Sequence, residues 1–286
     1  LGGNGVTAFV SITRGCDNMC TFCVVPYTRG RERSRDPKSI IKECQDLFNN
    51  GYKEITLLGQ NVDSYLWFGG GAKKDFKKAS KQDKENSLNF ASLLDKVAKV
   101  DPKLRIRFST SNPQDMGVEV IDTMSKHVNI CNHIHLPVQS GSSRILKLMN
   151  RGYDREKYFK LIDEIKKRIP NCAISMDMII GFCSETEEDH KETISLMNYV
   201  SYDFGYMYKY SVRPNTPASR MEDSVPEELK QARLAEIIKN QLAHSLLHMK
   251  NKLGNTYEVL IEGDSKKSNQ HFYGRTTHNS AVIFEK

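Results

Sequence analysis

The sequence predicts an α/β protein built on a parallel sheet, followed by a small all-β segment. Short runs rich in β-branched and aromatic residues alternate with longer runs whose apolar residues recur at helical spacing. After about residue 255 this alternation stops, and strand-like runs follow one another directly. Strands that alternate with helices form parallel sheets with right-handed crossovers. Periodicity alone does not decide whether such a sheet stays open or curls into a partial barrel.

The predicted elements follow in chain order. The first strand covers residues 7–13, and a helix covers 37–50, with Asp36 as its N-cap, Pro37 at its first position and Gly51 after its end. Further strands are expected at 54–58, 105–109, 134–136, 173–180 and 204–210. Further helices are expected at 90–99, 118–127, 142–149, 154–168, 185–199 and 226–253, and short strands at 256–261, 272–276 and 281–284.

Residues 69–86 interrupt this alternation. They contain three consecutive glycines and a lysine-rich run, which is typical of an exposed, mobile insertion. Its lysines either contact a polyanion or form a solvated loop, and the second is more common. The domain boundary falls later, giving a core at 1–253 and a small β-domain at 254–286. Because the chain starts at Leu1 and residues 281–286 resemble a strand cut in mid-domain, we expect a fragment at both ends.

Composition limits the class of protein. Of 286 residues, 38% are hydrophobic and 27% charged, as in a globular domain that can bury a large core. No run approaches the ~20 apolar residues that span a bilayer, so no membrane association is expected. Seven cysteines, an odd number, argue against a disulfide framework and favour a reducing compartment. The net charge of +7 permits a polyanionic partner without requiring one.

The chemistry centres on Cys16, Cys20 and Cys23, spaced C-x3-C-x2-C directly after the first strand. Ligand sites in parallel α/β proteins lie at that carboxyl edge. Three clustered thiolates suit a soft metal or an iron–sulfur cluster, whereas a closed zinc site takes four ligands. Cys44 falls on an apolar helix face and is expected in the core. An incomplete zinc site or three inert thiols remain the alternative.

Positive charge follows the cysteines. Arginines alternate along the chain at Arg29, Arg31, Arg33 and Arg35, close to Tyr27. Arginine pairs with phosphate in bidentate geometry, and single-stranded RNA is bound by stacking on aromatic rings and guanidinium groups. Internal ion pairing is the alternative, and we expect it for some of the four arginines.

The motif with Phe22 before its third cysteine resembles the signature of the radical S-adenosylmethionine (SAM) superfamily. Residues 24–35 resemble the methylthiotransferase branch, and V-P-Y-T-R-G resembles its MiaB-type tRNA members. Further matches lie at 58–62, 107–110, 135–142, 149–153 and 210–218, and the residues from 255 on resemble the start of a TRAM domain. One departure is Cys183-Ser184, where many relatives have Pro-Gly.

This resemblance implies a partial (β/α)6 TIM-like barrel followed by an incomplete TRAM-like RNA-binding β-domain. It implies a [4Fe-4S] cluster on the three cysteines, whose open iron binds SAM. One electron then cleaves SAM to a 5′-deoxyadenosyl radical that abstracts hydrogen from substrate. The SAM contacts that it implies, together with strand-end position, are Phe22, Gly59, Gln60, Ser109, Gln139, Ser140, Arg151, Ser175, Asp177 and Gly181. Each of these could instead be an ordinary turn or strand-end residue.

The resemblance further implies methylthiolation at C2 of N6-isopentenyladenosine beside the tRNA anticodon. Its implied partners are the anticodon stem-loop and an electron donor such as flavodoxin or ferredoxin, in the cytoplasm or, in a eukaryote, the mitochondrion. A second [4Fe-4S] cluster is expected on a preceding domain, so this chain alone is expected to cleave SAM without inserting sulfur. The alternatives are methylthiotransferases for threonylcarbamoyl-adenosine or a ribosomal protein, and a non-catalytic metal-stabilised RNA-binding module.

Overall fold

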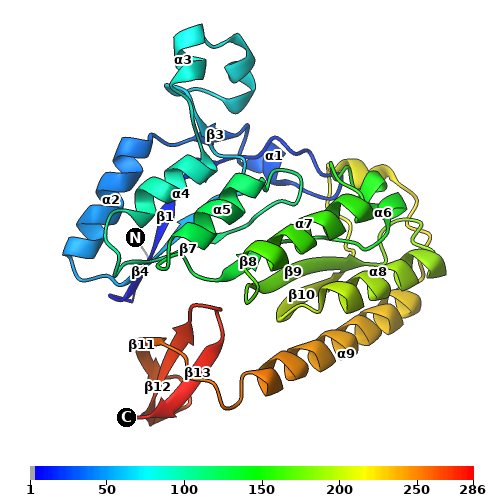
Figure 1. The fold of residues 1–286 in the computed structure, drawn as a ribbon. Coiled ribbons are helices and arrows are strands. Elements are labelled where there is room, and N and C mark those ends of the chain that lie inside the picture. The colour runs from blue at the N-terminus through cyan, green and yellow to red at the C-terminus, as the bar shows by residue number, and fades with distance from the viewer. Residues whose placement is uncertain (1–3) are drawn as a thin grey trace.

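The computed structural model describes residues 4–286 and contains two parallel three-stranded sheets with helices on their outer side (Figure 1). Their strand orders are β1-β4-β7 and β8-β9-β10. The bounds are β1 (Thr7–Ser11), β4 (Glu54–Leu58), β7 (Arg105–Ser109), β8 (His133–His135), β9 (Ala173–Ile180) and β10 (Phe204–Lys209).

A parallel bridge between Ile106 and Ile130 connects the two sheets, beside the start of β8. Within residues 4–286, β1 and β10 pair with a strand on one side only, so the barrel is open between them. The expected partial (β/α)6 barrel is therefore confirmed, in the form of two halves rather than one continuous ladder.

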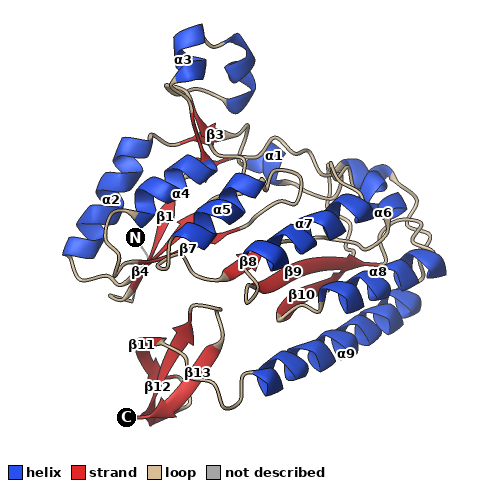
Figure 2. Cartoon of the chain, in the orientation of Figure 1, coloured by secondary structure: helices blue, strands red, loops and turns tan. Residues whose placement is uncertain are grey.

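Helices cover the outer side of the sheets, as Figure 2 shows in blue. Asp36 accepts hydrogen bonds from the amides of Lys38 and Ser39 and caps α2 as predicted. The helix expected from 185 starts at Glu187 because Thr186 is its N-cap in a capping box with Asp189. No helix among residues 4–286 has both the length and the apolar character to cross a bilayer. The bounds are α2 (Pro37–Asn49), α4 (Phe90–Ala98), α5 (Val118–Lys126), α6 (Ser143–Leu148), α7 (Arg155–Arg168), α8 (Glu187–Val200) and α9 (Glu227–Asn251).

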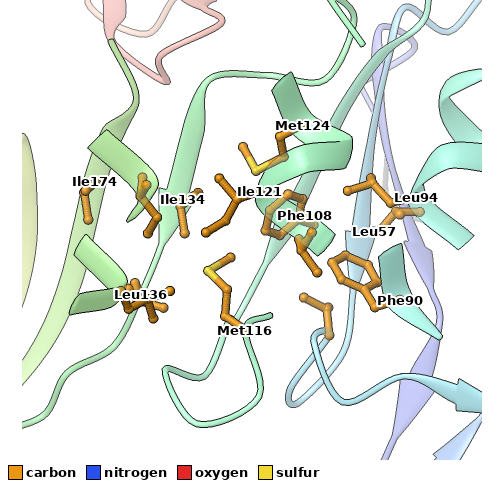
Figure 3. Close-up of a cluster of buried hydrophobic side chains, with 14 of the residues drawn as sticks. Leu57, Phe90, Leu94, Phe108, Met116, Ile121, Met124, Ile134, Leu136 and Ile174 are labelled. Atoms are coloured by element: carbon orange, nitrogen blue, oxygen red, sulfur yellow. The ribbon is translucent and has the colours of Figure 1, made fainter. Parts of the chain in front are cut away.

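The main core lies between the sheets and these helices. Leu57 of β4, Phe90 of α4 and Phe108 of β7 are almost completely buried, and the two phenylalanine rings meet edge to face at 5.3 Å between centroids (Figure 3). Cys44 of α2 has no exposed surface, as its helical position predicted. Burial of this kind contributes about 25 cal/mol per Å² of apolar surface removed from water.

Several short elements were not predicted, because a few residues carry no periodicity. Two small antiparallel pairs, β2 with β3 and β5 with β6, flank the first sheet. The expected loop at 69–86 contains two helical turns and projects from the body of the molecule (Figure 1). The bounds are β2 (Thr13–Arg14), α1 (Val25–Thr28), β3 (Arg33–Ser34), β5 (Leu66–Trp67), η1 (Lys73–Lys78), α3 (Lys81–Glu85), β6 (Leu88–Asn89) and η2 (Pro217–Arg220).

The C-terminal strands β11 (Val259–Ser265), β12 (Ser268–Thr276) and β13 (Ala281–Glu285) form one antiparallel sheet. This sheet contacts the amino ends of β4 and β7. Glu54, with no exposed surface, lies 2.9 Å from Arg275 Nη2 and 2.9 Å from Arg107 Nε; the second contact is an ion pair without hydrogen-bond geometry. Arg107 also donates to the carbonyl oxygen of Thr276 at 2.6 Å. The small sheet is therefore held at the strand edge opposite the carboxyl ends.

Candidate functional site

The three cysteines lie in the loop between β2 and α1, at the carboxyl edge of the first sheet. The loop begins at Gly15, whose φ of +77° favours glycine. A Cβ at this position would lie 2.3 Å from the carbonyl oxygen of Arg31, and the Cys16 amide donates to the Gly30 carbonyl at 3.2 Å. The start of the cysteine loop is thus packed closely against the segment around residue 30.

The end of α6 holds the other part of this loop. Thr21 donates from its amide to the Met149 carbonyl at 3.0 Å and from Oγ1 to the Leu148 carbonyl at 2.9 Å. The side-chain amide of Asn150 donates to the Met19 carbonyl at 2.9 Å. These bonds explain why the M-N-R segment, far away in sequence, belongs to the same site.

Arg151 places a cation beside one thiol. Its Nη1 lies 3.2 Å from Cys20 Sγ, and its Nη2 donates to the Pro137 carbonyl at 3.1 Å. Its Nε donates to the Tyr153 hydroxyl at 3.1 Å. A guanidinium at this distance can donate a charge-assisted hydrogen bond to the sulfur. We therefore interpret Arg151, a predicted cofactor contact, as a partner of the Cys20 sulfur.

The thiols line one cavity, and their chemistry fits an iron–sulfur cluster. Burial raises the pKa of Cys16 to about 11 and also raises the pKa of Cys23, so both are neutral thiols near pH 7 in the metal-free chain. Metal binding would displace these protons. Within residues 4–286, no three His, Cys, Asp or Glu side chains form a group able to hold one metal ion. Three cysteines on one short loop would hold an iron–sulfur cluster by binding its iron atoms through their sulfurs.

Eight predicted site residues meet in this cavity. They come from the cysteine loop, from the segments after β4 and β8, from β9 and from the loop after α6, so the site spans the two halves of the barrel. The eight are Cys16, Cys20, Phe22, Cys23, Gln60, Gln139, Arg151 and Asp177. Six further residues that the sequence analysis missed also line it, namely Asn18, Val25, Thr110, Ser111, Asn112 and Pro137.

Two lining residues have left-handed backbone conformations. Thr110 and Gln139 each have a φ of +72°. For a β-branched threonine this conformation costs about 1–3 kcal/mol and persists only where its surroundings impose it. Gln139 is held by backbone bonds to Asp177 and Ile179 of β9, both 2.9 Å long. Thr110 directly follows predicted Ser109, so extending the strand-end rule by one residue would have found it.

Five predicted contacts lie outside the cavity lining. Packing accounts for the two glycines: a Cβ on Gly59 would lie 2.0 Å from Thr13 Oγ1, and one on Gly181 would lie 2.3 Å from Lys230 Cγ. The others are Ser109, which ends β7, and the buried serines Ser140 and Ser175. These five are not among the residues that line the cavity, and their contacts to SAM stay a prediction.

Cys183 also lies outside the cavity lining. Its side chain is buried beside Phe182, Tyr210 and Ala218. This placement does not support a role of the Cys183 thiol as a cluster ligand.

Ser175 takes part in a hydrogen-bonded chain behind Asp177. Its Oγ lies 2.9 Å from His133 Nε2 and 2.9 Å from His135 Nδ1, and His135 Nε2 lies 3.5 Å from Asp177 Oδ1. Burial lowers the pKa of His133 to about 3, so this imidazole is neutral. These hydrogen bonds hold the ring of His135, which lies beside the carboxylate of Asp177 at the cavity.

The basic segment divides into paired and unpaired arginines. Arg31 forms an ion pair with Asp17 at 3.1 Å, and Arg35 forms one with Glu43. Arg29, Arg33 and Tyr27 are exposed, and neither Arg29 nor Arg33 has an ion-pair partner among residues 4–286. Internal pairing was expected for some of the four arginines, and two of them have it, with Asp17 and Glu43 as partners.

Comparison with known proteins agrees with this site. A family model described as the radical SAM superfamily matches residues 10–197, and one described as the TRAM domain matches residues 250–286. The chain is 64% identical to the tRNA-2-methylthio-N(6)-dimethylallyladenosine synthase of Christiangramia forsetii, over 100% of this chain and 60% of that protein. It is 51% identical to the protein of the same name from Bacteroides fragilis, over 99% of this chain and 60% of that one. The chain thus spans about 60% of the length of these relatives.

Solved structures with the same fold are more distant in sequence. Coproporphyrinogen III oxidase from Escherichia coli, described as a radical SAM enzyme, has a TM-score of 0.55 at 17% identity, over 84% of this chain and 52% of that one. The radical SAM methyltransferase TsrM from Kitasatospora setae has a TM-score of 0.55 at 16% identity, over 74% of this chain and 38% of that one. Fold, cysteine loop and family model agree: the chain belongs to the radical SAM superfamily.

Proposed function

We propose that this chain is the catalytic core of a tRNA methylthiotransferase that modifies C2 of N6-isopentenyladenosine beside the anticodon. The observation that carries the proposal is the cavity at which three thiols, Arg151 and strand-end polar groups meet. The name shared by relatives at 51–64% identity supplies the substrate and the reaction. The same resemblance supplies a second cluster outside this chain, a flavodoxin- or ferredoxin-type electron donor and a cytoplasmic location.

Cys16, Cys20 and Cys23 would hold the [4Fe-4S] cluster. When bound, the cluster supplies the electron that cleaves SAM. Arg151 contacts the Cys20 sulfur from one side, and Asp177 and Gln139, whose side chains carry oxygen acceptors, line the cavity. Such acceptors suit the hydroxyl and ammonium groups of SAM. We assign Phe22 and Gln60, which also line the cavity, to the same ligand.

Exposed aromatic side chains on the two edge strands of the open barrel suit an RNA base. Tyr206 pairs in register with Asp177, so the two side chains share one face of the sheet, and 53% of Tyr206 is exposed. Phe9 is 56% exposed on β1, the other edge of the open barrel. Unstacked RNA bases bind by stacking on such rings. Tyr27, Arg29 and Arg33 provide a further ring and two free cations for the RNA backbone, whereas Arg31 and Arg35 already have internal partners.

The proposal is tested by deleting the encoding gene in its source organism and analysing tRNA nucleosides by mass spectrometry. We expect the 2-methylthio derivative to disappear and N6-isopentenyladenosine to accumulate. A plasmid with the intact gene should restore it, and Cys20→Ala should not. Unchanged 2-methylthio content in the deletion strain contradicts the proposal.

The metal content separates the proposal from a non-catalytic, metal-stabilised RNA-binding module. After anaerobic reconstitution with iron and sulfide, we expect about four irons bound by the three cysteines and 5′-deoxyadenosine formation from SAM, both lost in Cys20→Ala. Stoichiometric zinc without SAM cleavage would favour the module instead.

A further inference from the structure

Residues 69–86 form a projection whose base is hydrogen-bonded to the body of the protein, and this segment is here called the lysine arm. Its start is a turn of Gly69, Gly70 and Gly71, with φ values of +97°, +116° and +92° that only glycine adopts without strain. The arm then forms η1 and α3, and Ser80 caps α3 by accepting from the Asp83 amide at 3.0 Å. It contains six lysines and three acidic residues.

The base of the arm is joined to the cysteine loop through Glu32, a carboxylate with 1% exposure. Glu32 Oε1 accepts from Ser64 Oγ at 2.6 Å and lies 3.4 Å from Lys73 Nζ. Its carbonyl accepts from the Lys73 amide at 2.9 Å, and its amide donates to Asp17 at 3.2 Å. The arm, the arginine segment and the loop between Cys16 and Cys20 are therefore one connected unit.

The helical geometry of η1 places the lysines of the arm on different sides of the helix. In a 3₁₀-helix residues i and i+3 lie on the same side. Lys73 and Phe76 share the inner side: Lys73 pairs with Glu32, and Phe76 packs on Phe68 at 5.3 Å between ring centroids. Lys74 and Lys77 consequently share a different, exposed side.

Lys78 extends this exposed surface. Lys74, Lys77 and Lys78 have no ion-pair partner among residues 4–286, whereas Lys81 pairs with Glu85. These three ammonium groups thus stand on a short helix whose first residue bonds to Glu32, the chain neighbour of the exposed Arg33.

We propose that Lys74, Lys77 and Lys78 of the lysine arm bind backbone phosphates of the RNA whose base enters the cavity. The inference rests on the proposed function and adds a second contact region to it. Phosphate contacts supply sequence-independent affinity and fix the orientation of a nucleic acid. Because the arm's base is bonded to the cysteine loop, a stem held on the arm is positioned relative to the cluster ligands.

The test compares two triple variants with the same loss of charge. Lys74→Gln, Lys77→Gln and Lys78→Gln neutralise the arm, and Lys157→Gln, Lys160→Gln and Lys167→Gln neutralise three exposed lysines on α7. The probe is a fluorescent anticodon stem-loop RNA containing N6-isopentenyladenosine. Its affinity is measured by anisotropy between 50 and 200 mM salt, and circular dichroism checks that both variants fold.

We expect the arm variant to bind the RNA about tenfold more weakly, because each exposed ion pair contributes a few-fold. The slope of log affinity against log salt should fall by about 2 to 3, since three phosphate contacts give about 0.7 each on a single strand and about 0.9 each on a duplex. The α7 variant should keep the wild-type slope. Equal binding by both variants overturns the arm proposal alone, whereas absence of RNA binding by the wild type overturns the proposed function with it.

Discussion

Replacing Glu54 with glutamine tests how the C-terminal sheet is held to the barrel. Glu54 has no exposed surface and lies 2.9 Å from a guanidinium nitrogen of Arg107 and 2.9 Å from one of Arg275. The side chains of these arginines are 5% and 23% exposed. Removing the negative charge leaves buried Arg107 without an ion-pair partner among residues 4–286, whereas Arg275 keeps its pair with Glu262. Breaking a buried pair in this way costs about 3–5 kcal/mol of unfolding free energy.

The measurement is urea unfolding at pH 7, followed by circular dichroism. Asp46→Asn is the matched control, because it also removes one carboxylate, but from an exposed pair with Lys42 at 3.9 Å. Exposed i,i+4 pairs contribute about 0.3–0.5 kcal/mol. If Glu54→Gln lowers the unfolding free energy by less than about 1 kcal/mol more than the control does, the reasoning on the buried network is refuted.

Two further predictions concern the cysteine loop and the strand ends near it. Gly15→Ala places a Cβ 2.3 Å from the Arg31 carbonyl and should abolish iron binding. The control Gly51→Ala is also at positive φ but in open space, so it should bind iron like the wild type. Equal iron content in the two variants would contradict this prediction. Burial raises the pKa of Asp63 to about 7, above the value of about 3.9 in the unfolded chain. The contribution of Asp63 to the unfolding free energy is therefore present at low pH and is lost as pH rises from about 4 to about 7. Asp63→Asn, which keeps a side-chain oxygen able to accept from the Asn112 amide at 2.9 Å, should gain stability relative to the wild type across this window; parallel pH profiles of unfolding free energy would refute it.

The regular elements of the barrel could be predicted from sequence because each satisfies a local rule. β4, β7 and β9 have the predicted bounds, and Asp36 with Pro37 marks the start of α2. The two-residue strands escaped because their pairing depends on distant contacts. The Leu66 amide, for example, bonds to Ser34 Oγ, which no local pattern encodes.

The cavity shows the same division. The cysteines, Gln139 and Asp177 could be placed because strand ends in a parallel barrel meet at one edge. Strand alternation places Ser175 on the same face as Asp177. The contacts of Ser175 to two histidines could not be predicted, because they depend on which strand lies beside it in the fold. At Gly59 and Gly181 the structure shows close packing, since a Cβ would meet Thr13 or Lys230. Their contacts to SAM stay a prediction.

The position of the C-terminal sheet determines how long a bound RNA would have to be to contact both this sheet and the cavity. This sheet contacts β4 at Glu54, whereas Gln60, six residues further along the chain, lines the cavity. At ~3.3 Å per extended residue the two points lie up to about 20 Å apart. A free nucleoside is too short to touch both, but a folded stem-loop is long enough. For the RNA of the proposed function, contacts at both ends would add the avidity of two linked sites, which a free nucleoside would lack.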